Sequence, residues 1–266
     1  MIQYDKGSAT RVGNRSNNQD RCCVVEHGES LLIFLADGMG GHKGGELAAQ
    51  EAMDCFVEIF RQQLTPIDNP ALFLEIAMQD AHRNVSGIGA NDNPPWYPRT
   101  TCVACLVQDN MAYWAYLGDS RLYILRDDNV HERTRDHTYI EELYQNDVIS
   151  EDEMLTHPMR NYVTYCLGGP NKMPPASSGH IDELQPGDII LLCSDGLWGA
   201  INVEDICQLK GIAIDTAINR MAEEAERISH PNSDNVTLVG IKLLEREPVD
   251  ALANTADEDT AELTGS

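Results

Sequence analysis

Residues 31–42 read LLIFLADGMGGH, an apolar run that ends in an aspartate followed by glycines. The preceding stretch 21–26, RCCVVE, is also typical of a strand, and the turn signal His27-Gly28-Glu29 separates the two, which predicts a β-hairpin. Downstream, residues 46–63 carry apolar side chains at the spacing of an amphipathic helix, and a second helix is predicted over 70–86. A hairpin beside paired helices is therefore the first block of the fold.

The rest of the chain continues this mixture of strands and helices. Three strands are predicted at 101–108, 111–117 and 121–126, joined by tight turns. They are followed by short helical pieces at 138–146 and 150–155, a strand at 188–193, helices at 202–209 and 213–229, and a last strand at 236–244. Because the rhythm of parallel strand–helix–strand units is absent, the pattern predicts an antiparallel α+β domain.

The composition limits the classes of partner. The chain has 266 residues, 43 of them acidic and 19 basic, for a formal net charge of -24. A nucleic-acid binder relies on clustered Lys and Arg, and an anionic membrane surface attracts the same residues, so we expect neither partner. No apolar run approaches the ~20 residues of a membrane span.

The cysteines and the end of the chain give two further expectations. Eight cysteines without an export signal favour a reducing compartment, the cytoplasm. Cys102 and Cys105 lie in a predicted strand, whose alternation places them on opposite faces, so a packing role is favoured over zinc or redox chemistry. Residues 245–266 hold seven acids and one arginine, a composition typical of a disordered tail, and the globular domain is assigned to 1–244.

Aspartates recur beside apolar strands and small residues. One such aspartate alone is typical of a turn former. Five that converge would repel one another strongly, and few Lys or Arg lie near them to compensate, which favours bound cations. Oxygen ligands without a set of His and Cys favour Mg²⁺ or Mn²⁺, and two such ions suit in-line attack on a phosphate ester. The five are Asp20, Asp37, Asp119, Asp195 and Asp234.

The ordered motifs of the chain resemble the PPM family (type 2C) of metal-dependent serine/threonine protein phosphatases, in its bacterial form. The likeness covers about residues 8–243. It consists of RSNNQD at 15–20, DGMGGH at 37–42, GDSR at 118–121, DHT at 136–138, SDGLW at 194–198 and DNVT at 234–237. The resemblance implies a four-layer α/β/β/α sandwich, with two antiparallel sheets between helices and the metals at one end of the sheets.

The resemblance also implies which residues bind the catalytic ions. Asp37 bridges two ions, helped by the carbonyl of Gly38 on one of them, while Asp195 and Asp234 ligate the other. Asp20 acts mostly through ordered water. The chemistry agrees, because a glycine lets the backbone approach an ion closely.

Three further roles follow from the resemblance, each beside a simpler interpretation. Arg15 resembles the phosphate clamp, although it is alternatively a surface residue paired with an acid. His42 is the candidate that protonates the leaving oxygen, or else a loop residue that bonds locally or orients a water. Asp119 helps to hold a third, weaker ion, unless it only caps its turn.

The implied function is hydrolysis of phosphoserine and phosphothreonine on proteins by metal-activated water, with a serine/threonine kinase acting on the same substrates. The alternatives are a binuclear hydrolase of small phosphorylated metabolites and a non-catalytic phosphoprotein-binding module.

Residues 136–178 match the family's flap beside the active site. Arg99 stands where the family usually has glycine, which leaves the shape of that loop open.

Overall fold

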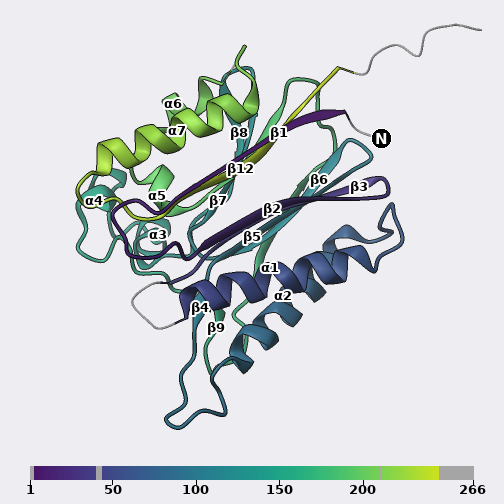
Figure 1. The fold of residues 1–266 in the computed structure, drawn as a ribbon. Coiled ribbons are helices and arrows are strands. Elements are labelled where there is room, and N and C mark those ends of the chain that lie inside the picture. The colour runs from purple at the N-terminus through teal and green to yellow at the C-terminus, as the bar shows by residue number, and fades with distance from the viewer. Residues whose placement is uncertain (1–2, 40–43, 210, 246–266) are drawn as a thin grey trace, which may run out of the picture.

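Two five-stranded antiparallel sheets lie face to face between two layers of helices (Figure 1). The computed structural model describes residues 3–39, 44–209 and 211–245. The first sheet has the order β1-β12-β11-β7-β8, formed by Tyr4–Arg11, Val236–Leu243, Ile189–Cys193, Arg121–Arg126 and Asn129–Arg133. The second has the order β10-β6-β5-β3-β2, formed by Ser177–Ile181, Met111–Leu117, Cys102–Gln108, Ser30–Asp37 and Asp20–His27.

Each sheet carries its helices on its outer face. Helices α1 (Gly45–Arg61) and α2 (Pro70–Gly87) cover the second sheet. The first sheet is covered by α5 (Asp195–Trp198), α6 (Val203–Cys207) and α7 (Ile214–Ser229). The predicted four-layer α/β/β/α sandwich is therefore confirmed.

Strand β3 shows why the strand sequences are continuously apolar. Its residues Leu32, Phe34 and Ala36 pack under α1 and α2, whereas Leu31, Ile33 and Leu35 pack against the first sheet. A strand buried on both faces gains nothing from polar alternation. The same alternation separates Cys102 and Cys105 into different cores, which confirms their packing role.

The segment 136–178 leaves the sheets and returns to them. It contains α3 (Tyr139–Gln145), α4 (Glu151–Thr156) and β9 (Leu167–Gly168), and β9 pairs with β4 (Arg99–Thr100) in a short ribbon. The predicted strand 101–108 corresponds to β5 and begins one residue later than expected, whereas β4 was not predicted. Within the segment 136–178, the two sides of the helical part are joined, because Tyr139 N–H donates to Tyr162 O at 3.0 Å.

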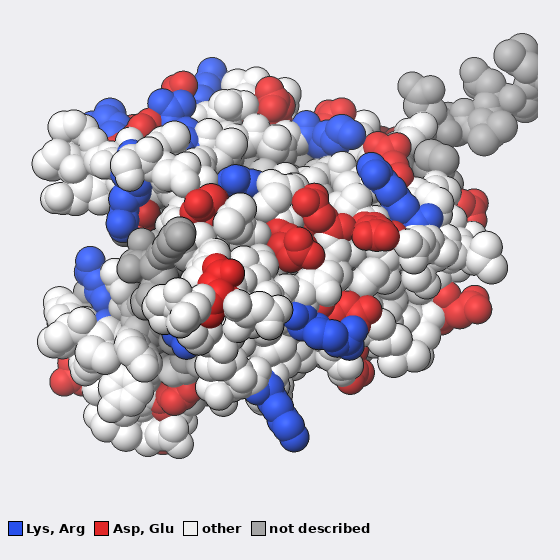
Figure 2. Space-filling view, turned by 60° about the horizontal axis from the view of Figure 1, so that its bottom comes forward, with Lys and Arg blue, Asp and Glu red and all other residues white. Residues whose placement is uncertain are grey.

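The predictions on charge, membrane spans and the tail compare with the structure as follows. Figure 2 shows a face on which acidic and basic side chains are interspersed. Among the helices of the described residues, none combines the length and apolar character needed to cross a bilayer. Apart from Glu245, the predicted acidic tail lies outside the described residues.

Candidate metal centre

The five aspartates come together at one end of the two sheets. Asp20 and Asp37 are direct partners at the open end of the β2–β3 hairpin. Asp195 begins α5 two residues after β11 ends, and Asp234 lies two residues before β12, the strand beside β11. Asp119 lies in the turn between β6 and β7, and β7 also pairs with β11.

A buried hydroxyl joins the two sheets at this end. Ser194 Oγ donates to Asp20 Oδ2 at 2.9 Å and accepts from the backbone N–H of Thr237 at 3.0 Å. The other carboxylate oxygen, Asp20 Oδ1, is buried and has no hydrogen-bond partner among the described residues. A buried carboxylate oxygen without a partner is costly, so this atom is available to a water or a cation.

Two threonines fix the backbone of Asp37. Asp37 N–H donates to Thr101 Oγ1 at 2.9 Å, while Thr101 N–H and Thr100 Oγ1 donate to Asp37 O at 2.8 and 2.9 Å. Thr101 Oγ1 also lies 2.7 Å from Ser120 Oγ, in the turn that carries Asp119. These threonines position the aspartates, a role that the sequence pattern did not predict.

Gly38 is fixed by a close backbone approach. A Cβ atom built on Gly38 would lie 2.3 Å from the carbonyl oxygen of Gly45, the first residue of α1. Only glycine fits there, and its N–H donates to Gln19 O at 3.2 Å. The position therefore requires a residue whose backbone can be approached closely.

The carboxyl groups disfavour one another's ionisation. Burial, and then the charges of the neighbouring aspartates, raise the pKa values of Asp37 and Asp195 well above their ordinary range. Burial also raises the pKa of Asp20, and it raises that of Asp119 to about 7, with the charge of Asp136 adding to the shift. At neutral pH the cluster therefore requires protons or cations.

The nearby arginines are engaged. Arg15 Nη2 lies 2.7 Å from Asp234 Oδ2, with 55% of the Arg15 side chain exposed. Arg121 makes a bidentate pair with Asp136, at 2.8 and 2.7 Å, over the ring of Trp198. Trp198 Nε1 in turn donates to the carbonyl oxygen of Asp119 at 2.9 Å. Arg121 thus supports the Asp119 turn, while Asp37 and Asp195 have no such partner among the described residues.

The donor set fits a hard divalent cation. It consists of carboxylate and carbonyl oxygens, with one buried oxygen atom unpartnered. In the part of the chain that the structure describes, no three Asp, Glu, His or Cys side chains form a set that would by itself hold an ion. An ion here therefore needs backbone carbonyls and water as well, which suits Mg²⁺ and Mn²⁺. His42 lies outside the described residues.

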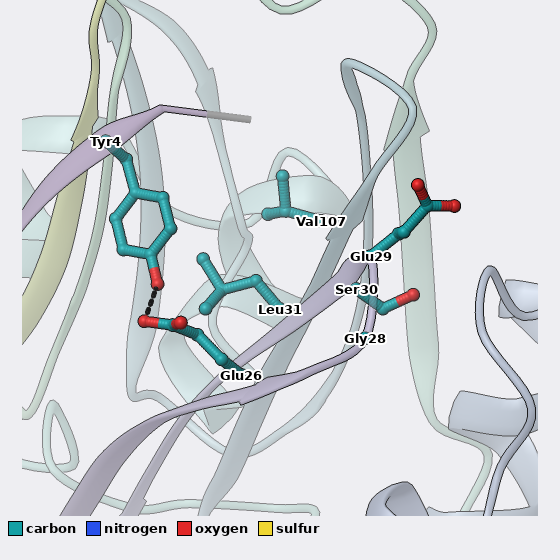
Figure 3. A pocket seen from close by; sticks show the side chains of 7 residues that line it. All are labelled: Tyr4, Glu26, Gly28, Glu29, Ser30, Leu31 and Val107. Atoms are coloured by element: carbon teal, nitrogen blue, oxygen red, sulfur yellow. Dashed lines mark hydrogen bonds between the residues drawn. The ribbon is translucent and has the colours of Figure 1, made fainter. Parts of the chain in front are cut away.

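A separate small cavity, of about 20 Å³, lies at the other end of the hairpin (Figure 3). It is bounded by Tyr4, whose hydroxyl donates to Glu26, and by residues of the β2–β3 turn. It has room for about one water molecule. This cavity is therefore too small to be the candidate site.

Comparison with known proteins agrees with this fold and identifies the family. The family model for protein phosphatase 2C matches residues 8–224. The protein phosphatase PhpP of Streptococcus pneumoniae is 30% identical over 247 residues, which cover 90% of this chain and 97% of PhpP. The chain therefore belongs to the protein phosphatase 2C family. Within that family it is a protein serine/threonine phosphatase of the PPM type.

Solved structures show the same architecture. The serine/threonine phosphatase of S. agalactiae superposes with a TM-score of 0.83 at 26% identity, covering 91% of this chain and all of that one. The catalytic domain of the phosphatase PstP, solved with two manganese ions, gives a TM-score of 0.77 at 27% identity, covering 92% of this chain and all of that one. The PstP domain thus shows that the fold can hold two metal ions.

Proposed function

We propose that this phosphatase hydrolyses phosphoserine and phosphothreonine on proteins at a binuclear Mg²⁺ or Mn²⁺ centre built on Asp37. Asp37 would be shared by both ions, with the Gly38 carbonyl on one and Asp195 and Asp234 on the other. Asp20 would act through water, and Asp119 would help to hold a third, weaker ion. When bound, the ions would supply positive charge that activates water and neutralises phosphoryl oxygens.

The observation that carries this proposal is the convergence of five aspartates from separate segments. Four of their pKa values are raised, chiefly by burial. A structural cluster with no ligand would gain stability from neutral residues of similar shape, because like charges oppose folding. A cation-binding function explains why carboxylates stand there.

The chain's own residues would bind and orient the substrate. The planar guanidinium of Arg15 would bind two phosphoryl oxygens and leave its present partner Asp234. Thr100 and Thr101 would keep Asp37 in position by their hydrogen bonds to its backbone. His42 would hold the proton that the departing seryl or threonyl oxygen receives. Water attacks phosphorus, the phosphorus–oxygen bond breaks, and the products are the free hydroxyl side chain and phosphate.

The proposal also includes a partner kinase, a cellular compartment and the bounds of the catalytic domain. A protein kinase that phosphorylates the same proteins would be the functional counterpart of this enzyme. All eight cysteines are free, which supports a reducing compartment such as the cytoplasm. The catalytic domain would comprise 1–244, with 136–178 as the flap that selects protein substrates.

Phosphate release tests the proposal directly. A phosphothreonine peptide, a phosphorylated metabolite and an aryl phosphate are compared with Mn²⁺ and with chelator. We expect metal-dependent hydrolysis of the peptide and the aryl phosphate. Hydrolysis of the metabolite alone would identify a small-molecule hydrolase, and tight binding of the peptide without turnover would identify a binding module.

A further inference from the structure

We propose that a basic pocket between α2 and the end of the flap binds an anionic side chain of the phosphoprotein substrate. This inference rests on the function proposed above and adds a second contact for the same substrate. The pocket has a volume of about 390 Å³. The lining residues that matter here are His82, Arg83, Ser86, Tyr97, Gly169 and Lys172.

The pocket has an unusual charge for this chain. Acidic residues outnumber basic ones 43 to 19 overall, yet the lining includes Arg83 and Lys172 and no Asp or Glu. Arg83 Nη2 lies 2.9 Å from Asp80 Oδ1, and 72% of the Arg83 side chain is nevertheless exposed. Lys172 is exposed and makes no ion pair within the described part of the chain. The lining therefore favours an anion.

One hydroxyl in the lining lacks a partner. Ser86 Oγ is buried and accepts or donates no hydrogen bond among the described residues. A serine within a helix can bond to a carbonyl of the preceding turn, and Ser86 in α2 does not. Because Ser86 also lines the pocket, its hydroxyl is an unused hydrogen-bonding group in the pocket wall.

The pocket wall is held in place. His82 Nδ1 accepts from Gly168 N–H at 3.2 Å, so Nε2 carries the hydrogen and donates to Asn171 O at 3.1 Å. These two bonds attach the segment 168–172 to α2. The anion site thus has a fixed wall on one side and α2 on the other.

The pocket lies close to the aspartates along two paired segments. Thr101, which bonds the Asp37 backbone, lies four residues after Tyr97 of the pocket, a separation of at most ~14 Å. Arg99 lies between them and pairs with Gly168. A Cβ atom on Gly169 would lie 3.3 Å from Arg99 Nε, so the Arg99 side chain lies over this glycine. Arg99 thus extends positive charge from the catalytic rim to the pocket.

An extended peptide covers this separation in about four residues. We therefore expect the pocket to bind a carboxylate or a second phosphate within about four residues of the phosphorylated residue.

The test compares the double variant Arg83→Gln/Lys172→Gln with the matched control Arg220→Gln/Arg227→Gln. Both remove two positive charges, and Arg227 pairs with Glu224 at the same spacing as Arg83 with Asp80. The control residues lie on α7, in the opposite helical layer. The substrates are an aryl phosphate and phosphothreonine peptides with neutral, glutamate or phosphoserine residues three positions before or after.

We expect wild type and control to prefer an acidic peptide, and the pocket variant to lose at least fivefold in kcat/KM on it, mainly through KM. Turnover of the neutral peptide and the aryl phosphate should stay within twofold. Glutamate and phosphoserine peptides show which anion is preferred. Absence of a preference in wild type, or equal losses on neutral and acidic peptides, would overturn the pocket.

A failure of the proposed function would be distinct, because wild type would then hydrolyse no phosphopeptide. In that case the pocket is tested by binding alone, with fluorescence anisotropy of the labelled, doubly phosphorylated peptide. Weaker binding to the pocket variant than to the control supports the pocket, and equal binding rejects it.

Discussion

Arg15 and Asp234 form an ion pair, with 2.7 Å between Arg15 Nη2 and Asp234 Oδ2. The proposed phosphate clamp and a proposed metal ligand thus neutralise each other. Both side chains are partly exposed, 55% and 40%, so the pair contributes little to stability and is readily exchanged. Metal binding at Asp234 would therefore release Arg15 for the substrate.

Replacing Arg15 tests this exchange. We expect Arg15→Ala to raise KM for a phosphothreonine peptide and lower kcat/KM about 10- to 100-fold, since charged hydrogen bonds are worth roughly 1.5–3 kcal/mol. The metal concentration for half-maximal activity should not rise, because Asp234 loses a competitor. Steady-state kinetics at several Mn²⁺ concentrations measures both quantities. An unchanged KM would show that Arg15 is only the surface partner of Asp234.

The titration of Asp119 should make stability depend on pH. Its folded-state pKa is raised from 3.8 to about 7, so the folded chain holds this proton more tightly than the unfolded chain. The extra proton affinity of Asp119 contributes to the stability of the folded chain below about pH 4. This contribution is lost as the pH rises through about 7. In chelator, the Tm of Asp119→Asn minus that of wild type should therefore increase from pH 5 to pH 8. A difference that is constant or decreases would contradict the raised pKa.

The metal dependence of Asp119→Ala tests the third ion. The variant should fold, because the turn keeps the bond from Trp198 Nε1 to the residue 119 carbonyl. We expect lower kcat and a higher metal concentration for half activity, with two inner sites retained. Calorimetric titration with Mn²⁺ counts the sites. If the variant shows the same number of sites and the same metal dependence as wild type, Asp119 binds no ion and only caps its turn.

The flap should affect peptides more than small substrates. His137 anchors its start, since Nδ1 accepts from Gly118 N–H at 3.2 Å and Nε2 lies 2.9 Å from Ser177 Oγ. Residues 139–162 can therefore be exchanged for the PhpP segment while this anchor remains. We expect altered kcat/KM on phosphopeptides and aryl phosphate turnover within about twofold. Equal losses on both would show that the flap supports the chemistry itself.

The fold was predictable where local pattern and burial agree. The hairpin β2–β3, helices α1, α2 and α7, and strands β6 and β7 lie where the apolar spacing predicts them. Strand β1 was not predicted, because Tyr4–Arg11 is polar and pairs with β12 more than 220 residues away. A Cβ atom on Gly7 would lie 2.6 Å from Asp215 Cα, so α7 covers β1 at a glycine. Such tertiary contacts leave no local periodicity.

The site was predictable only in part. Motifs at strand ends identified the aspartates, because carboxylates beside small residues are visible in the chain. The hydrogen bonds by which Thr101 and Ser194 position these aspartates were not predictable, because each bond depends on a partner from another segment. A threonine just before a strand and a serine just before Asp195 are the local signals available. Neither signal indicates which aspartate it contacts.

The activity of Asp37→Asn with manganese tests the central claim most directly. The variant should fold, and in chelator it should be at least as stable as wild type, because the neutral amide removes like-charge repulsion at Asp37. Calorimetry should show fewer Mn²⁺ sites. On a phosphothreonine peptide with saturating Mn²⁺ we predict less than about a tenth of the wild-type kcat, a loss of more than ~1.4 kcal/mol. A folded variant that keeps more than about a tenth of wild-type kcat would contradict the binuclear centre on Asp37.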